Sequence, residues 1–397
     1  MNHPLFGKTL NLLQSLVEFD TGSNLSNLKL IAFVQEYLTS FCVESSLFNN
    51  RSGEKANLYA TIGPSDRSGL CLSGHTDVVP ATGQPWTVEP FALTWRGKRV
   101  LGRGTADMKG FLASVLANVP NFIAQCRHIP IHLAFSYDEE AGCRGVRGLL
   151  SEMASMPFKP LACVIGEPTG MQVAVAHKGK QAYRCCVKGL AGHSALIDRG
   201  VNAVEFAAEL ATFLRRKARD LCTMGHLDER FEPPYSTIHV GKLNGGTALN
   251  VIPDHAEIEF EIRNLPGDDP DQIVSSVRSY AELELVEEMR RIAPEAGIEW
   301  VELAKYPALA EEPGSTWLRD LACDLTGDPS FHALSFGTEG GLFQEIGIPT
   351  IVCGPGSIEQ AHKADEYVEL EQMVRCLDFL SKLAEQCSRP IAEFVAL

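Results

Sequence analysis

The sequence lacks the features that mark membrane proteins and nucleic-acid-binding proteins. No apolar run approaches the roughly 20 residues that a membrane helix needs, and residues 1–8 show no charged segment leading into an apolar one, as a secretory signal would. No stretch is rich in lysine or arginine, and the formal net charge is -15, which argues against nucleic acid and acidic membranes as partners. A small cationic or zwitterionic substrate stays compatible with this charge.

Cysteine and glycine motifs are also missing. The twelve cysteines are scattered, with one adjacent pair, Cys185 and Cys186, and no Cys-x-x-Cys. In a chain of 397 residues this pattern is typical of free, buried thiols in a reducing compartment rather than of a disulfide framework. We therefore expect a soluble protein of the cytoplasm. No Gly-x-Gly-x-x-Gly follows the first expected strand, which excludes the usual dinucleotide-binding site.

Apolar runs alternate with helical patterns in both the first and the last part of the chain. Short, continuous apolar runs predict buried strands, and apolar positions three and four residues apart predict helices. Their alternation indicates an α/β layer with a largely buried, mixed sheet. The expected strands are 57–62, 69–73, 131–136, 161–165 and 350–353, and the expected helices are 6–20, 26–45, 110–121, 144–153, 317–325 and 369–386.

The pattern changes between residues 178 and 304. Alternation of apolar and polar residues, clearest in 257–263, predicts half-buried strands. The expected order is strand 181–188, helix 202–219, strands 236–243 and 257–263, helix 271–291 and strand 298–303. This βαββαβ order predicts a four-stranded sheet with two helices on one face. Since 397 residues exceed what one core usually supports, we expect a larger domain in two parts, 1–177 and 305–397, with domain 178–304 inserted in it.

Two imidazoles and several carboxylates stand near the ends of the expected strands or helices. They are His75, Asp107, Glu139, Glu140, Glu167 and His362. Open α/β sheets bind ligands at the carboxyl ends of their strands, where most of these residues fall. Oxygen and imidazole nitrogen donors suit zinc or a similar divalent ion, and there are enough of them for two ions.

Each of these residues has an ordinary structural interpretation when it is taken alone. His75 alone is more often a satisfied buried histidine, and Asp107 is placed to cap a helix. The pair Glu139 and Glu140 fits a solvated acidic turn. Asp77 changes the interpretation of His75, because a carboxylate two residues away can accept the second ring N–H. Acids that follow buried strands also need compensation, since desolvating an unpaired charge is costly, and a bound cation supplies it.

Adjacent carboxylates allow a division of labour at a two-ion centre. One carboxylate can bridge two ions about 3.5–4 Å apart, while an imidazole and a terminal carboxylate complete each side. One acid is then left beside the cluster to act as general base on an activated water. The pair Glu139 and Glu140 offers both roles, since one side chain can bind an ion while its neighbour moves the proton.

The motifs around these residues resemble those of the co-catalytic zinc amidohydrolase and exopeptidase family. The resemblance covers essentially the whole chain in order and rests on SGHTDVVP (73–80), GRGTADMKG (102–110), DEE (138–140), GEPT (166–169), GHSA (192–195) and QAHK (360–363). That family contains acetylornithine deacetylases, succinyl-diaminopimelate desuccinylases, aminoacylases and several exopeptidases. The details GQPWT (83–87), GTADMKGF (104–111), AHKG (176–179) and CGPGSIEQAHK (353–363) are most similar to the acetylornithine deacetylases.

The resemblance implies a ligand set for two divalent ions. His75 and Glu167 would bind one ion. Glu140 and His362 would bind the other, and Asp107 would bridge the two. The peptide bond that follows this aspartate would be cis. Zinc is the expected metal, with cobalt as the alternative, since the same ligands accept either ion.

Further residues receive roles from the same resemblance. Asp77 would orient the histidine two residues before it, and Glu139 would act as general base and acid. His193, in the inserted domain, would reach the site of a neighbouring subunit and donate a hydrogen bond to the oxyanion. Arg263 would bind the α-carboxylate of the substrate, with Asn250 near the same site. The alternatives are a plain surface histidine at position 193 and structural roles for the other two.

These parallels predict the activity of an acetylornithine deacetylase. A metal-activated water would hydrolyse N-acetyl-L-ornithine to L-ornithine and acetate, a step of arginine biosynthesis, in the larger, catalytic domain. The inserted domain would serve as a lid and would form the contact of a homodimer. The alternatives are a desuccinylase, another N-acyl amino acid hydrolase or a dipeptidase with the same metal site, or a metal-binding homologue without catalysis.

Glu339, in FGTEGG (336–341), prompts a separate hypothesis about specificity. Desuccinylases must hold an anionic succinyl group, and an acid in the pocket would repel it. An acid facing the substrate would instead favour the side-chain ammonium of ornithine. Glu339 is therefore predicted to be a substrate-binding residue.

Overall fold

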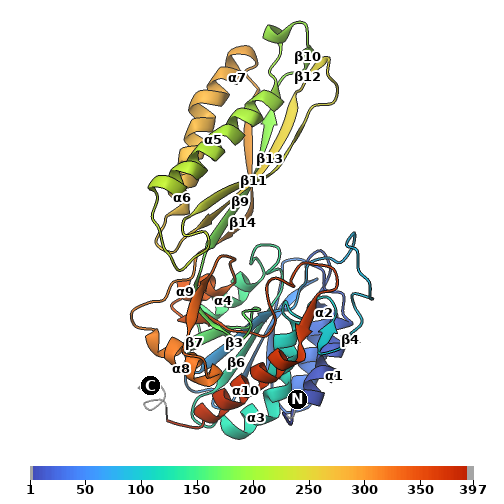
Figure 1. Ribbon diagram of the computed structural model, residues 1–397, viewed down its shortest axis with the longest axis vertical. Helices are drawn as coiled ribbons and strands as arrows, with labels where there is room; N and C mark the ends of the chain where they lie inside the picture. Colours follow the sequence, from blue (N-terminus) through green and yellow to red (C-terminus); the bar gives the residue numbers. More distant parts are fainter. Residues whose placement is uncertain (1–2, 391–397) are drawn as a thin grey trace. The chain divides into compact units, whose positions relative to one another are not determined.

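The computed structural model describes residues 3–390, which divide into two compact units (Figure 1). The first unit contains the chain up to residue 176, residues 309–333 and the chain from residue 338 onward. The second unit contains residues 177–308 and 334–337. The sequence placed the boundaries of the inserted domain at 178 and 304. No helix within residues 3–390 is long and apolar enough to cross a membrane.

An eight-stranded sheet forms the centre of the first unit (Figure 1). The strands, in spatial order, are β1 (Ser45–Asn49), β2 (Ala56–Ile62), β6 (Ile131–Ser136), β3 (Leu70–His75), β7 (Ala162–Ile165), β16 (Thr350–Val352), β8 (Val173–His177) and β15 (Phe331–Leu334). β3 pairs in parallel with β6 and β7, and β7 pairs in parallel with β16. The pairs β1–β2, β2–β6 and β16–β8 are antiparallel. The predicted α/β class with a mixed sheet is therefore confirmed.

Helices cover both faces of this sheet. Alternate residues of a strand face opposite sides, and in β3 both sets are buried, with Leu70 and Leu72 on one side and Cys71 and Ser73 on the other. The leucine side packs in one core with α1 (Phe6–Val17), α2 (Leu28–Thr39), α3 (Lys109–Gln125), α8 (Thr316–Thr326) and α10 (Leu370–Gln386). The other side carries α4 (Val146–Ala154) and α9 (Gly340–Glu345), which contact each other and strands β2, β7 and β16.

The four central strands determine where functional residues meet. β6, β3, β7 and β16 run parallel to one another, so their carboxyl ends lie along one edge of the sheet. The polar segments that follow these ends include residues 76–80, 137–145, 166–169 and 353–363. This edge is where α/β sheets place their ligands.

One expected helix is wrong at its C-terminal end. We expected a helix over 26–45, but α2 ends at Thr39 and residues 45–49 form β1 at the edge of the sheet. The helix ends in a turn in which Cys42 has φ +57° and the N–H of Val43 donates to the carbonyl of Leu38 (3.1 Å). Short strands also escaped prediction because they carry little periodic signal. They include β8, β15, β4 (Thr94–Arg96), β5 (Arg99–Leu101) and β17 (Tyr367–Glu369).

The second unit is built on a four-stranded antiparallel sheet. Its strands, in spatial order, are β11 (Thr237–Gly245), β13 (His255–Asn264), β9 (Gly179–Lys188) and β14 (Gly297–Tyr306). Every second residue of β13 is buried, and this side packs against α5 (Ala203–Met224) and the helical stretch α6 (Pro270–Tyr280), 281–286 and α7 (Glu287–Ile292). The predicted βαββαβ order is confirmed. A small strand pair, β10 (Gly192–His193) and β12 (Val251–Ile252), was not predicted.

His132 lies buried in β6 of the first unit. Its Nδ1 atom is 3.0 Å from the hydroxyl of Thr61, and its ring stacks on that of Tyr59 with centroids 5.6 Å apart. The Nε2 atom has no hydrogen-bond partner among residues 3–390. Burial lowers the pKa of His132 to about 4. The folded protein therefore keeps this imidazole neutral where an exposed histidine would be charged.

This depressed pKa predicts a loss of stability in acid. Above pH 6.5 the imidazole is neutral in the folded and in the unfolded chain. As the pH falls from 6.5 towards 4, only the unfolded chain binds the proton, so the free energy of unfolding falls by about 1.4 kcal/mol per pH unit. His132→Gln should flatten this pH dependence, measured by urea unfolding, whereas His128→Gln at an exposed position should not. Equal slopes in both variants would contradict the prediction.

Candidate active site

The six residues expected at a metal centre lie in the first unit, along the carboxyl edge of the central strands. His75 ends β3, Glu139 and Glu140 lie in the turn after β6, Glu167 follows β7, Asp107 precedes α3, and His362 lies in the loop after β16. The Asp107–Met108 peptide bond is cis, as the resemblance implied.

Asp107 lies between the two imidazoles. Its Oδ1 is 2.9 Å from Nε2 of His75, and its Oδ2 is 3.4 Å from Nε2 of His362. The Oε1 atom of Glu167 is 3.6 Å from the same nitrogen of His75. The Oε2 atom of Glu140 is 3.0 Å from that nitrogen of His362. Each imidazole therefore has Asp107 and one glutamate beside it.

The carboxylates of this cluster are almost completely buried. The side chains of Asp107, Glu140 and Glu167 are 6%, 8% and 6% exposed. Burial, and after it the charge of Asp107, raises the pKa of Glu140 and of Glu167. Burial opposes ionisation of Asp107 as well, but its contacts with His362 and His75 outweigh burial and lower its pKa. The same carboxylates, Asp107 first and Glu140 next, raise the pKa of His362 to about 10.

This donor set fits divalent metal ions. Donor atoms within 4.8 Å of one another occur in two overlapping groups, His75 with Glu139 and Glu167, and His75 with Asp107 and Glu140. Carboxylate oxygen and imidazole nitrogen are ligands that zinc and cobalt accept. Several buried carboxylates in one place are unfavourable without a cation, which explains why the pKa values of the glutamates are raised. A pair of bound divalent ions would offset this penalty.

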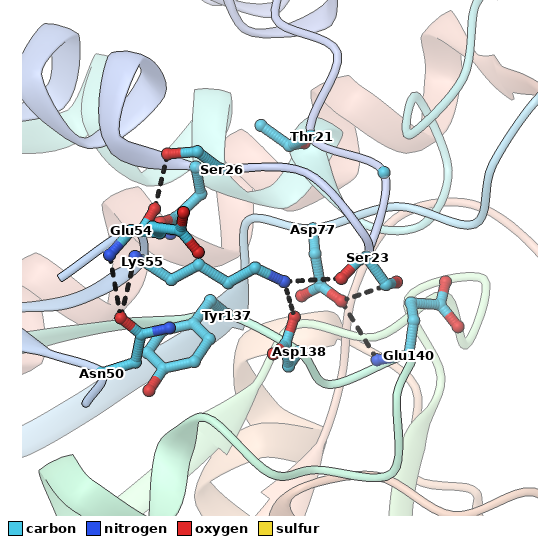
Figure 2. Close-up of polar contacts among 12 residues, drawn as sticks. Thr21, Ser23, Ser26, Asn50, Glu54, Lys55, Asp77, Tyr137, Asp138 and Glu140 are labelled. Atoms are coloured by element: carbon cyan, nitrogen blue, oxygen red, sulfur yellow. Dashed lines mark hydrogen bonds and ion pairs between the residues drawn. The ribbon is translucent and has the colours of Figure 1, made fainter. Parts of the chain in front are cut away.

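Asp77 supports two parts of the site at once, and Figure 2 shows its contacts with Ser23 and with the backbone of Glu140. The Nδ1 atom of His75 is 2.8 Å from the backbone carbonyl of Asp77 and 3.5 Å from its carboxylate. The carboxylate also accepts the backbone N–H groups of Glu139 (3.2 Å) and Glu140 (3.3 Å) and the hydroxyl of Ser23 (3.2 Å). The sequence predicted that the carboxylate would accept the ring N–H of His75, but the backbone carbonyl makes this short contact, and the carboxylate is engaged by the N–H groups of the turn. The contacts with the turn join distant segments and left no local signal in the sequence.

Glu139 lies beside the proposed ligands in the same turn. The thiol of Cys143 donates to its Oε1 (3.3 Å). Burial raises the pKa of Glu139 well above its ordinary value; His75 opposes this effect and the charge of Glu140 adds to it. A carboxyl group whose pKa is raised towards neutrality can take up a proton and return it.

Glu366 was not predicted from the sequence, and it holds the loop that presents Asp107. Its carboxylate, 1% exposed, accepts the backbone N–H groups of Gly104 (3.1 Å), Ala106 (2.9 Å) and Asp107 (3.1 Å). It also accepts a hydrogen bond from the buried guanidinium of Arg103 (2.8 Å). A single acid in a loop gives no signal of this kind, because the N–H groups that it binds gather only in the folded chain.

A second unpredicted contact reaches His362. The side-chain amide of Gln84 donates to the backbone carbonyl of His362 (3.0 Å), and its oxygen accepts hydrogen bonds from Trp86 (3.2 Å) and Arg103. His362 has φ +61°, which is uncommon for a residue other than glycine. Gln84 therefore braces a proposed ligand whose side chain is 51% exposed.

The remaining predicted residues of the inserted domain lie in the second unit. His193, in β10, pairs with Val251 of β12, and the backbone N–H of Ser194 donates to the carbonyl of Asn250 (3.2 Å). The structure thus brings His193 and Asn250 together. Strand β12 precedes the N-terminal end of β13, and Arg263 lies near the C-terminal end of β13. The Nε of Arg263 donates to Glu261 (2.8 Å).

Glu339 is the N-cap residue of α9 in the first unit. Its side chain is 1% exposed, and its Oε1 atom has no hydrogen-bond partner among the described residues. Burial raises the pKa of Glu339 to about 7. The charge of Glu339 in turn contributes to the raised pKa of Glu139, which places the two carboxyl groups in the same neighbourhood.

Comparison with known proteins identifies the family. The sequence profile of peptidase family M20/M25/M40 matches residues 71–386. The chain belongs to this family. The acetylornithine deacetylase of Aliivibrio fischeri (strain ATCC 700601 / ES114) is 34% identical over 333 residues, 83% of this chain and 84% of that protein. The acetylornithine deacetylase of Proteus mirabilis (strain HI4320) is 32% identical over 382 residues, 94% of this chain and 93% of that protein.

Solved structures of other proteins share the fold. The aminopeptidase PepT from Bacillus cereus ATCC 10987 matches with a TM-score of 0.71 at 18% identity, over 97% of this chain and 99% of that one. The YXEP protein of Bacillus subtilis, a dinuclear metal-binding peptidase, matches with a TM-score of 0.66 at 16% identity, over 96% and 98%. Family membership and the named relatives make this M20 chain a metal-dependent amidohydrolase.

Loss of the Glu366 contacts should destabilise this M20 chain. Glu366→Gln leaves the Arg103 guanidinium, 1% exposed, without its charged partner, which should lower the free energy of unfolding by about 3–5 kcal/mol. The same change loosens the Asp107 loop and should weaken zinc binding, measured by titration. Glu369→Gln removes a partner of Arg99 at the surface and should change both quantities little. Full stability of Glu366→Gln would show that other contacts hold the loop.

Proposed function

We propose that this chain is an acetylornithine deacetylase, which hydrolyses N-acetyl-L-ornithine to L-ornithine and acetate in arginine biosynthesis. The observation that carries the proposal is the position of Asp107, whose two oxygens face His75 and His362 separately at 2.9 and 3.4 Å. This arrangement is expected of a carboxylate that bridges two metal ions. Relatives that carry this name cover up to 94% of the chain, which supports the choice of substrate.

The proposed ligands form two sets around Asp107. His75 and Glu167 bind one ion, in keeping with their separation of 3.6 Å. Glu140 and His362, 3.0 Å apart, bind the other. Zinc is the proposed metal, with cobalt as the alternative. Two ions held by these residues would supply a water molecule of lowered pKa and a positive charge beside the scissile amide carbonyl.

Glu139 is the proposed general base and acid. Its carboxylate takes the proton of the attacking water and later gives it to the leaving α-amine, without which C–N cleavage is slow. The hydrogen bond from its backbone N–H to Asp77 (3.2 Å) and the one from Cys143 to its Oε1 (3.3 Å) hold the group in place. These contacts support the role, because a proton carrier must stay within hydrogen-bond reach of both partners. Asp77 also orients His75, in this proposal.

Arg263 is the proposed partner of the substrate's α-carboxylate. A planar guanidinium binds a carboxylate through two parallel N–H groups, and the contact of its Nε with Glu261 (2.8 Å) fixes the orientation of the group. Asn250 lies beside His193 and not near Arg263 as expected, so its proposed contact is with the substrate that His193 reaches. Glu339 is proposed to favour the side-chain ammonium of ornithine, because a nearby cation stabilises the charged form of this buried carboxyl group, whose Oε1 has no hydrogen-bond partner among the described residues.

A second copy of the chain completes the site in this proposal. Arg263 and His255 are eight residues apart on β13, which corresponds to about 26 Å along a strand. His193 lies beyond the His255 end, beside β12. One small substrate cannot contact both Arg263 and His193 of the same second unit. We therefore assign His193 to the substrate of a neighbouring copy in a homodimer formed through the inserted domain, where it donates a hydrogen bond to the oxyanion.

The proposed location is the cytoplasm. All twelve cysteines are free, and most of them are buried thiols. Thiols of this kind persist in a reducing compartment.

Steady-state hydrolysis by the zinc-loaded protein tests the proposed substrate. N-acetyl-L-ornithine should be cleaved with a higher kcat/KM than N-succinyl-diaminopimelate, N-acetyl-L-methionine or a simple dipeptide. Glu139→Ala removes the proton carrier and should lower kcat by a factor of at least about 10²–10⁴ with zinc still bound. A preference for another of these substrates would assign the chain to a desuccinylase, an acyl amino acid hydrolase or a dipeptidase. Inactivity on all four with metal bound would indicate a homologue without catalysis.

Glu339→Gln in the same assays tests the basis of the preference. The neutral amide keeps the size of the side chain and should narrow the discrimination between N-acetyl-L-ornithine and N-acetyl-L-methionine. Unchanged discrimination would remove Glu339 from the substrate-binding residues.

Mixing two inactive variants tests the role of His193. His193→Ala should lower kcat by about 10²–10³ with the metal content unchanged, since one oxyanion donor is lost. In a mixed dimer with Glu139→Ala, one site combines an intact Glu139 with the intact His193 of the other subunit. Activity should therefore return in part after subunit exchange. No recovery, together with normal turnover by His193→Ala alone, would leave His193 as a plain surface residue.

A further inference from the structure

The turn that carries Glu139 and Glu140 has an unfavourable backbone. Asp138 and Cys143 have φ +55° and +54°, a region that residues other than glycine rarely adopt. Two hydrogen bonds close the turn, from the N–H of Cys143 to the carbonyl of Glu139 (2.8 Å) and from the N–H of Arg144 to that of Asp138 (3.1 Å). Such a conformation persists only where surrounding contacts enforce it.

Asp77 is the first of these contacts. Its two carboxylate oxygens accept the N–H groups of Glu139 and Glu140, so it holds the inner side of the turn. These bonds fix the backbone of both glutamates. They leave Asp138, the residue at which the turn begins, without restraint from this side.

Lys55, the residue just before β2, provides the second contact (Figure 2). Its ammonium group donates to the carboxylate of Asp138 and to the backbone carbonyl of Ser23 (2.5 Å). The side chain is only 12% exposed, and the backbone of Lys55 is held by Asn50, whose side-chain oxygen accepts its N–H (3.2 Å). The base of the lysine is therefore anchored at the same time as its tip.

Ser23 joins the two contacts. Its hydroxyl donates to the carboxylate of Asp77 (3.2 Å), while its carbonyl accepts from Lys55. Figure 2 shows the resulting path from Asp77 through Ser23 and Lys55 to Asp138. The backbone then returns from Asp138 to the two N–H groups that Asp77 binds, which closes a ring around the turn.

We propose that Lys55 is a positioning residue that holds the Asp138–Glu140 turn in the shape needed for metal binding by Glu140 and proton transfer by Glu139. This inference rests on the roles proposed above for the two glutamates. Lys55 does not touch the ligands and acts through Asp138 and Ser23. It sets the geometry of the one ion that Glu140 binds, and it leaves the His75 and Glu167 side of the centre to other contacts.

The direction in which metal affinity changes when Lys55 is replaced distinguishes a positioning role from a purely electrostatic one. Removing a positive charge near the centre should by itself strengthen the binding of both cations, since a like charge is lost. Loosening the turn should instead weaken the binding of one ion and leave the binding of the other unchanged. Groups that support metal ligands typically change metal affinity or activity by about 10–100-fold.

Zinc titration of Lys55→Met is the experiment, with the number of bound ions and their dissociation constants as the readout. One of the two ions should bind about 10–100-fold more weakly to Lys55→Met than to the unchanged protein. Lys55→Arg, which keeps the positive charge, should retain most of the affinity for this ion. With both sites saturated, kcat should fall while KM stays the same, because Glu139 is displaced and substrate contacts are not. Equal or tighter binding of both ions in Lys55→Met would overturn the proposal.

Two further variants keep the result interpretable. Lys242→Met removes the same charge from an exposed lysine paired with Glu259 in the second unit, and it should leave both dissociation constants unchanged. The double mutant of Lys55→Met and Asp138→Asn should lose less metal affinity than the two single mutants added together, because both substitutions remove the same contact. Strict additivity of the two losses would overturn the assignment even if Lys55→Met alone folds poorly. The metal readout needs no substrate, so a failure of the proposed deacetylase activity does not affect it.

Discussion

Burial of several carboxylates at one edge of a sheet is the constraint on which the rest of the first unit depends. Asp77, Asp107, Glu140 and Glu167 are each less than a tenth exposed. An isolated buried charge is strongly unfavourable, so each acid needs a partner. Imidazoles, backbone N–H groups and a serine hydroxyl provide part of that compensation, and the donor set fits divalent ions for the remainder.

Several residues make no contact with a proposed ligand side chain but hold the loops that carry these ligands. Glu366 binds the backbone of the Asp107 loop, Gln84 binds the carbonyl of His362, and Lys55 binds the turn of Glu139. Each of these contacts supports a segment that lies outside the regular helices and strands. The rigidity of the centre thus comes from loops tied to one another above a stiff, buried sheet, a common way to hold functional groups within narrow tolerances.

The second unit follows a different plan. The apolar side chains of its two helical segments pack on one face of its antiparallel sheet. On the other face, the strand side chains are polar, as in β13. It has an apolar core of its own, distinct from the core of the first unit. The distance along β13 between Arg263 and the end that adjoins β12 is the reason that the proposed substrate contacts of Arg263 and His193 are assigned to different copies of the chain.

The sequence by itself determined the α/β class, the βαββαβ order of the insertion and the acids and histidines that the fold gathers at the carboxyl edge of the sheet. Each rests on a local pattern: apolar periodicity for the elements, and short motifs such as GHTD and DEE for the acids and histidines. Only the tertiary structure decided the end of α2 at Thr39, the short strands, and the supports Glu366, Gln84 and Lys55. A long-range hydrogen bond joins residues far apart in the chain, and neither partner carries a local sign of the other.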